Sequence, residues 1–255
     1  MEKIKEIEKL AIEAIRKSGN LVLNNLNKSK SVKFKGERDY ITNSDIESEQ
    51  IIIQTIKKNF PYHNFYSEES TIDNNSDSTW IIDPLCSTNN FVYGLPMFGI
   101  AVGLKYKSDI IFGTIYLPVF DWLFKATKGS GAYMNDKPIN VSNKSELKDC
   151  LILYDNQFYK KKNIMFNYQK IVNAALTTRI SGSAAFDMCM VAAGYADARI
   201  FNKTKDCDFV VGALIIEEAG GKVTDFSGNR WMLGKKQIIA SNGKIHDQLI
   251  RVLSR

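Results

Sequence analysis

Apolar residues recur at helical spacing over the first part of the chain. Over Ile4–Leu26 they fall every three or four positions among charged residues, which predicts a long helix with one buried face. Turn-forming residues at 35–39 separate it from a second predicted helix, Asn43–Asn59, which ends before Pro61. Two helices are therefore expected before any sheet.

Short apolar or alternating runs follow, separated by turn residues, and they predict a meandering, largely antiparallel sheet. Its strands are expected at Asn64–Tyr66, Trp80–Asp83, Gly99–Tyr106, Ile110–Leu117, Trp122–Ala126 and Ala132–Met134. Because turn residues rather than helical patterns connect these runs, neighbouring strands are expected to pair in chain order.

Beyond Ser142 the pattern changes to an alternation of strands and helices. Strands are expected at Leu151–Tyr154, Ala198–Phe201, Lys222–Thr224 and Gln237–Ala240. Helices are expected at Asn163–Leu176, Ser183–Ala193 and Cys207–Ala219, and after Asn242-Gly243. No repeat or flexible linker divides the chain, so we expect two lobes, residues 1–142 and 143–255, that share a tight interface.

Composition is ordinary for a soluble globular protein: of 255 residues, 44% are hydrophobic and 24% are charged. No apolar stretch is long enough for a membrane span, and the charged N-terminus is unlike a secretory signal, so no membrane partner is expected. The four cysteines have no paired spacing and there are only two histidines. This disfavours a disulfide framework or a structural zinc site, and a reducing, cytoplasmic location is expected.

The formal net charge of +6 is compatible with attraction of phosphorylated substrates or nucleic acid. The lysines are dispersed, however, and only Lys160–Lys162 forms a compact run. This pattern favours solvated faces over a dedicated nucleic-acid surface.

Four acids stand in short, separated settings: Asp45, Glu68, Asp83 and Asp208. Asp83 follows an apolar run and precedes Pro84, so its side chain is expected to leave the sheet where the backbone turns, a good place for a metal ligand. If a short helix begins just after it, the first amides of that helix would point at an anion.

Each of these acids, taken alone, has a simpler structural explanation. Asp45 with Thr42 fits a capping box, and Asp206 and Asp208 fit caps of the helix that they open. Adjacent acids such as Glu68 and Glu69 at a strand end are usually solvated. Single acids therefore favour structural roles over catalysis.

Read together and in order, these segments resemble the inositol monophosphatase family, part of the wider lithium-sensitive, magnesium-dependent phosphatase superfamily. The resemblance covers nearly the whole chain. The segments that carry it are Tyr40–Asp45, Ser67–Ser70, Trp80–Phe91, Gly94–Phe98, Ile180–Ala185 and Asp208–Gly221. It implies a mixed α/β fold, a layered αβαβα sandwich of the inositol monophosphatase and fructose-bisphosphatase type, and a homodimer or larger oligomer.

The resemblance also implies hydrolysis of a small phosphorylated alcohol with Mg²⁺. By this match, Glu68, Asp83 and the backbone carbonyl of Leu85 would hold one metal ion. Asp83 and Asp208 would hold a second, together with an acid at the position where this chain has Cys86. Magnesium prefers oxygen ligands, so these residue types are consistent with that chemistry.

The same match assigns the remaining site residues. Thr88 and Asp45 would orient the attacking water, and the amides of Ser87 and Thr88 would hold the phosphate. The alcohol side would be lined by Gly182, Ser183 and Ala184. No histidine is placed to act as a base for Thr88, so its hydroxyl is better interpreted as an orienting group than as a nucleophile.

The chain departs from the family pattern Asp-Pro-Ile-Asp-Gly-Thr over residues 83–88. Cys86 replaces a ligand acid, and a thiol cannot supply the hard anionic oxygen that magnesium prefers. Ser87 replaces a glycine, which matters if that position needs a positive φ. Cys207 stands where a tryptophan is usual, and residues 200–202 contain no acid to bind a substrate hydroxyl.

Three hypotheses follow. The first is a magnesium-dependent phosphatase of inositol or sugar phosphates, active or impaired by Cys86. The second is a degenerate, regulatory protein resembling the extragenic-suppressor (SuhB-like) branch, acting with transcription complexes or RNA. The third, a redox or soft-metal switch at Cys86, is less favoured because no second cysteine is close in sequence.

Overall fold

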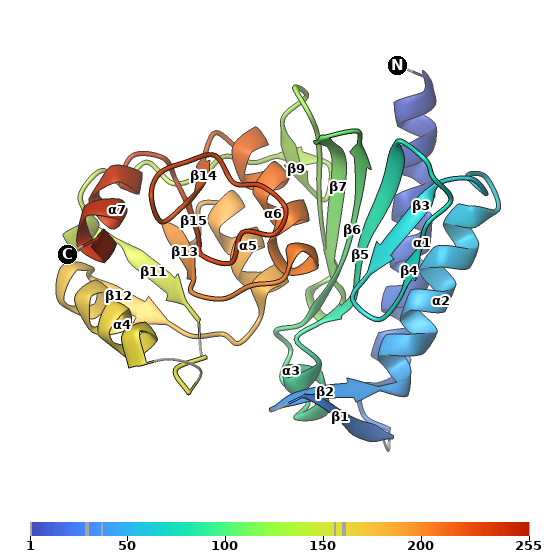
Figure 1. Ribbon diagram of the computed structural model, residues 1–255, viewed down its shortest axis with the longest axis horizontal. Helices are drawn as coiled ribbons and strands as arrows, with labels where there is room; N and C mark the ends of the chain where they lie inside the picture. Colours follow the sequence, from blue (N-terminus) through green and yellow to red (C-terminus); the bar gives the residue numbers. More distant parts are fainter. Residues whose placement is uncertain (1, 29–30, 37, 156, 160–161, 255) are drawn as a thin grey trace.

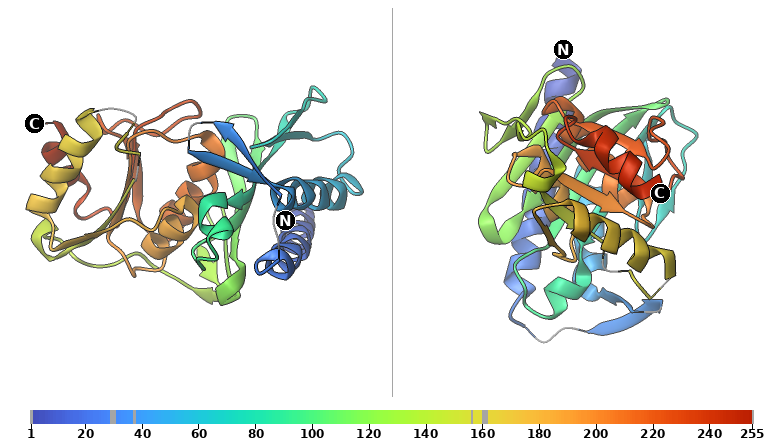
Figure 2. Two further views of the ribbon diagram at one scale, coloured as in Figure 1. Left: turned by 90° about the horizontal axis from the view of Figure 1, so that it is seen from below. Right: turned by 90° about the vertical axis from the view of Figure 1, so that its left-hand side faces the viewer.

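Five layers of helices and sheets stack across the molecule in the computed structural model, which describes every residue except 1, 29–30, 37, 156, 160–161 and 255 (Figure 1). One outer layer contains α1 (Glu2–Asn25) and α2 (Asn43–Lys57), the inner layer α5 (Ala184–Ala192) and α6 (Asp206–Glu218), and the other outer layer α4 (Lys162–Ala174) and α7 (His246–Ser254). A sheet lies in each gap, and the view from below in Figure 2 shows the same succession. The predicted αβαβα sandwich is confirmed.

The larger sheet has eight strands in the order β10-β9-β8-β7-β6-β5-β3-β4. Its strands are β3 (Asn64–Ser67), β4 (Thr71–Ile72), β5 (Ser78–Cys86), β6 (Gly99–Tyr106), β7 (Asp109–Leu117), β8 (Trp122–Thr127), β9 (Ala132–Met134) and β10 (Lys137–Pro138). All neighbours pair antiparallel except β3 and β5, which are parallel. The predicted meander is therefore present, with short edge strands that the sequence pattern did not indicate.

The smaller sheet has five strands in the order β12-β11-β13-β15-β14. Its strands are β11 (Leu151–Tyr154), β12 (Thr177–Arg179), β13 (Ala198–Phe201), β14 (Lys222–Asp225) and β15 (Ile238–Ser241). β11 is parallel to β12 and β13, and the other pairs are antiparallel. The predicted helix over 163–176 is too long, because α4 ends at Ala174 and β12 follows.

The inner helices pack against both sheets, and one hydrophobic cluster joins residues of both, including Phe124 of β8 and Phe201 of β13. Close approach of α5 and α6 requires Gly212, since a Cβ there would lie 2.6 Å from the Cβ of Met188. Helix α6 therefore packs closely against α5, and it also contacts β5. No helix in the described part of the chain is long and apolar enough to cross a membrane.

The prediction that two helices precede any sheet is wrong. β1 (Val32–Gly36) and β2 (Asp39–Thr42) form an antiparallel hairpin between α1 and α2. The predicted turn at 35–39 is shorter than expected, with Arg38 at a φ of 60° and Glu37 outside the described residues. Its strands were missed because their burial pattern barely alternates, so they carry little periodic signal.

The prediction that a strand ends at Asp83 is also wrong. Strand β5 continues through Pro84 to Cys86, with a shift of register against β6 between Asp83 and Cys86. Proline lacks the amide hydrogen that a regular ladder uses, and this irregularity is where a sheet tolerates it. The side chain of Asp83 therefore lies within the sheet and is buried, rather than projecting from its end.

Candidate active site

Asp45 and Thr88 form a buried hydrogen-bonded pair. Asp45 is the third residue of α2, and Thr88 is the first residue of the short helix α3 (Thr88–Val92). The Thr88 hydroxyl donates to Asp45 Oδ1 at 2.7 Å, while the Thr42 amide and hydroxyl donate to Asp45 Oδ2 at 2.8 and 2.6 Å. Burial raises the pKa of Asp45, and these hydrogen bonds oppose that shift. The carboxylate serves as a helix cap and also reaches the site.

Asp83 lies on β5 with only 1% of its surface exposed. Its Oδ1 finds no hydrogen-bond partner among the residues that the structure describes. Burial raises the pKa of Asp83 well above its usual range, and the negative charges of Glu68 and Asp208 raise it further. A buried carboxylate oxygen without a donor, facing two further acids, has the chemistry expected of a ligand to a hard cation.

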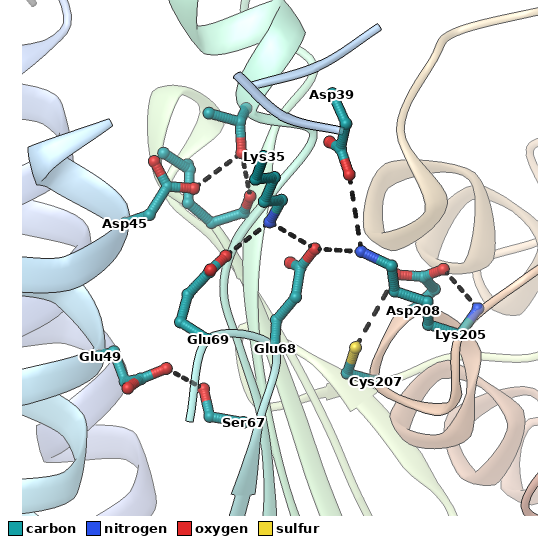
Figure 3. Close-up of polar contacts among 12 residues, drawn as sticks. Lys35, Asp39, Asp45, Glu49, Ser67, Glu68, Glu69, Lys205, Cys207 and Asp208 are labelled. Atoms are coloured by element: carbon teal, nitrogen blue, oxygen red, sulfur yellow. Dashed lines mark hydrogen bonds and ion pairs between the residues drawn. The ribbon is translucent and has the colours of Figure 1, made fainter. Parts of the chain in front are cut away.

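Glu68 is held by two lysines (Figure 3). The ammonium groups of Lys35 and Lys205 each lie 2.8 Å from Glu68 Oε1, and Lys35 also lies 2.5 Å from Glu69 Oε1. Burial would raise the pKa of Glu68, but the two ammonium groups lower it below its ordinary value. The expectation that Glu68 and Glu69 are solvated is wrong, since their side chains are only 11% and 14% exposed.

Asp208 is the third residue of α6, and it caps that helix as the sequence suggested. Its Oδ2 accepts from the Lys205 amide at 2.8 Å and from the Thr204 hydroxyl at 3.1 Å. Burial raises the pKa of Asp208. Helix geometry thus brings the last of the four acids to the ends of β3 and β5.

The carboxylate groups of these acids do not converge on a single point. In the described ranges, no three histidine, cysteine, aspartate or glutamate side chains are close enough to hold a metal ion. The carbonyl of Leu85, a further expected ligand, accepts a 3.3 Å hydrogen bond from the Thr88 hydroxyl. The donor chemistry of Glu68, Asp83 and Asp208 therefore fits a cation, while their present geometry is set by lysines and caps.

Cys86 is buried next to these acids. Its Sγ accepts a hydrogen bond of 3.2 Å from the Ala185 amide at the start of α5. Burial raises the pKa of the Cys86 thiol well above its usual value, and the charges of Asp83 and Asp208 add to that shift. A neutral thiol at this place offers no hard anionic oxygen.

A second thiol lies in the same region. Cys207 Sγ is 3.9 Å from Asp208 Oδ1, and the charges of Asp208 and Asp83, after burial, raise the pKa of this thiol too. The sequence argument that no cysteine lies near Cys86 holds along the chain only, because folding brings both thiols beside the same two acids. Spacing in the sequence gave no signal of this.

Ser87 has the left-handed conformation that its glycine counterpart would accept more easily, with φ 78° and ψ 56°. Its hydroxyl donates to the carbonyl of Gly182 at 2.7 Å. The residue that strains the backbone therefore also links α3 to the segment predicted to bind the alcohol.

The predicted alcohol side lies at the start of α5. Gly182 has a φ of 77°, and Ser183 caps the helix by accepting from the Phe186 amide at 3.3 Å. Ala184 is the first helical residue. Phe201, at the stretch where an acid is missing, is 3% exposed and packs in the shared core. The structure thus brings the loop to Ser87 but offers no carboxylate from that strand.

Sequence reasoning missed Lys35 and Lys205. Their common partner, Glu68, lies 33 and 137 residues away along the chain. Neither separation carries a local pattern, so the only available hint was that Lys205 directly precedes the cluster of acids that opens α6.

Comparison with known proteins gives relatives of nearly the same length. Inositol monophosphatase 2 of Solanum lycopersicum is 34% identical over 98% of this chain and 99% of its own. Nus factor SuhB of Pasteurella multocida (strain Pm70) is 34% identical over 94% of this chain and 93% of its own. The crystal structure of extragenic suppressor protein suhB from Bartonella henselae, 32% identical, superposes with a TM-score of 0.95 over 98% of this chain and 99% of that one.

The sequence profile of the inositol monophosphatase family matches residues 3–255. This span includes both outer helical layers, both sheets and every acid of the site. Family membership supports a phosphatase, and the relative from Solanum lycopersicum carries the name of such an enzyme. The chain belongs to the inositol monophosphatase family.

Proposed function

We propose that this protein hydrolyses a small phosphomonoester, inositol monophosphate or a similar sugar phosphate, in the presence of Mg²⁺. The observation that carries the proposal is the intact pair of Thr88 and Asp45, joined at 2.7 Å and buried beside the acids. Both oxygens of Asp45 are hydrogen-bonded within this arrangement, because the second oxygen accepts from the amide and the hydroxyl of Thr42.

The cation would be held by oxygen atoms of Glu68, Asp83 and Leu85, with Asp208 next to them. When bound, Mg²⁺ neutralises charge on the phosphate and lowers the pKa of water. The unpartnered Oδ1 of Asp83 supports this assignment, because it leaves a buried acceptor for a positive charge.

The remaining roles belong to the chain itself. Since the Thr88 hydroxyl donates a hydrogen bond to Asp45, its oxygen can accept a hydrogen bond from the attacking water and orient it. The amides of Ser87 and Thr88, at the start of α3, would bind phosphate oxygens. Gly182, Ser183 and Ala184 would line the alcohol side, in keeping with the contact between Ser87 and Gly182.

Cys86 limits how well a second cation is held. Its thiol is neutral in these surroundings, so only Asp83 and Asp208 would remain for that position. We therefore propose slow rather than efficient hydrolysis, because a cation that stabilises charge in the transition state is weakly bound.

Phosphate release over a panel of inositol, sugar and nucleotide monophosphates tests this function. The wild type should release phosphate slowly, Cys86→Asp about tenfold faster or more, and Thr88→Val about 100-fold more slowly. Thr88→Ser, which keeps the hydroxyl, is the matched control. No release by either wild type or Cys86→Asp, with both folded by circular dichroism, would sink the proposal.

The second candidate function is a regulatory role, and the observation that favours it is a buried cysteine, Cys86, in place of an expected ligand acid. A relative with 34% identity is named Nus factor SuhB, which makes transcription machinery or RNA the partner to test. Tagged protein should then retain RNA polymerase factors or RNA on purification from its own cells. Retention of neither counts against this role.

We also propose a homodimer in the cytoplasm. Helix α4 exposes large apolar side chains, among them Met165, Phe166 and Val172 at 52%, 56% and 46% of their surface. Exposed apolar patches on one helix favour association of copies. Sedimentation analysis of the wild type and of Phe166→Glu would give a dimer and a monomer, respectively.

A further inference from the structure

Two ammonium groups converge on a single carboxylate oxygen in the site. Lys35 reaches Glu68 Oε1 from β1, and Lys205 reaches it from the residue that precedes α6, each at 2.8 Å (Figure 3). The Lys205 contact joins residues 137 positions apart in the chain. Glu68, an expected cation ligand, is thus already neutralised by the chain itself.

The two lysines are not equivalent. Lys35 is only 18% exposed and remains 2.5 Å from Glu69, so it keeps a close partner whatever happens at Glu68. Lys205 is 52% exposed, and its other acid, Asp39 on β2, lies 3.6 Å from the same ammonium group. Lys205 is therefore the lysine that can move, and Asp39 is positioned to receive it.

A divalent cation on Glu68 would meet strong repulsion from an ammonium group on the same oxygen. The half-exposed stem of Lys205 can rotate away, while the buried acids cannot. We propose that Lys205 is a built-in competitor for the cation at Glu68, and that cation binding transfers its ammonium group from Glu68 to Asp39. This inference rests on the cation site of the proposed function.

The transfer has a clear consequence for affinity. The cation must break an ion pair before it binds, so its affinity is lower than the acids alone would give. Asp39 offsets part of that penalty by accepting the displaced charge. Removing Lys205 should therefore tighten binding, whereas removing the charge of Asp39 should weaken it only while Lys205 is present.

Calorimetric titration of Mg²⁺ into the cation-free full chain, without substrate, tests the competition. Lys205→Met should bind Mg²⁺ about five- to tenfold more tightly than wild type. Lys203→Met is the matched control, because it removes an exposed lysine two residues earlier, and its affinity should change less than about twofold. Equal affinities for the two variants, or no binding by wild type and Lys205→Met alike, would overturn the proposal.

A double-mutant cycle tests the transfer itself. Asp39→Asn should weaken Mg²⁺ binding about two- to threefold in the wild type and have no effect in Lys205→Met. The same weakening in both backgrounds would show that Asp39 acts only as a distant negative charge, and would refute the transfer. Tighter binding by Lys205→Met without phosphate release from any variant would instead support this inference while defeating the proposed function.

Discussion

Asp45 and Asp83 are both buried carboxylates, on the adjacent elements α2 and β5, yet their surroundings differ. Both oxygens of Asp45 accept hydrogen bonds from threonines. Oδ1 of Asp83 has no donor in the described part of the chain, and the negative charges of Glu68 and Asp208 act on this carboxyl more strongly than the positive charge of Lys35. The hydrogen bonds of the half proposed to orient water are thus completed by the protein, whereas the half proposed to hold a cation keeps a buried oxygen without a donor.

The largest expected effect comes from replacing each of these two acids by its amide. Asp83→Asn should reduce phosphate release about 10³-fold, yet increase the free energy of unfolding by about 1–2 kcal/mol without a cation, because it removes an unpaired buried charge. Asp45→Asn should lower the free energy of unfolding by about 1–3 kcal/mol, because its amide group would face donors. Urea unfolding in the presence of a chelator measures the free energy of unfolding of both variants. Equal destabilisation by the two substitutions would contradict the difference between the two acids.

A buried titratable group outside the site extends the comparison, because both of its ring nitrogens are hydrogen-bonded, as both oxygens of Asp45 are. His246 is fully buried, with Nδ1 and Nε2 each 2.8 Å from the hydroxyl of Ser241 or Thr224. Burial lowers the pKa of His246 to about 4. Because the unfolded chain takes up this proton near pH 6.5 and the folded chain only near pH 4, stability should fall by about 3 kcal/mol across that window as pH decreases.

The measurement is urea unfolding at several pH values for the wild type and His246→Gln, with His63→Gln as the control. The difference between wild type and variant isolates the histidine, since burial raises the pKa of Asp187 to about 6 and its contribution has the opposite sign over an overlapping window. A slope that is the same in wild type and His246→Gln contradicts the prediction.

The smallest effect is expected at Ser87, which links the segments proposed to bind the phosphate and the alcohol. Ser87→Gly relieves a left-handed conformation but loses the hydrogen bond to Gly182, so the free energy of unfolding should change by less than about 1 kcal/mol. Ser87→Ala keeps the strain and loses the bond, and should be less stable than Ser87→Gly by about 1 kcal/mol. Thermal unfolding of both variants provides the test, and the reverse order would show that strain is unimportant here.

The layers were predictable because helical and alternating periodicity is a local property of the sequence. The long helix α1 and the central strands β6 and β7 follow their patterns closely. The hairpin β1–β2 and the path of β5 through Pro84 did not follow from local rules, since tertiary pairing overrides weak or broken patterns.

The site was predictable only in part. Local motifs identified Asp45 and Asp208 and offered capping as an alternative to catalysis, but the structure shows both residues capping helices and facing the site. The contacts of the two lysines with Glu68 and of the Cys207 thiol with Asp208 could not be predicted from the sequence, because they depend on which segments the fold places side by side. Whether the assigned ligands bind a metal ion stays a prediction.

The four thiols of the chain are all free and buried, and the charges of the same two acids, Asp83 and Asp208, act on both Cys86 and Cys207. A thiol reagent can reach them only when the surrounding structure opens. The rate of labelling at each cysteine therefore measures how often the structure around it opens, and no engineered probe is required. At Cys86 the labelling rate would report how often solvent reaches the centre of the site.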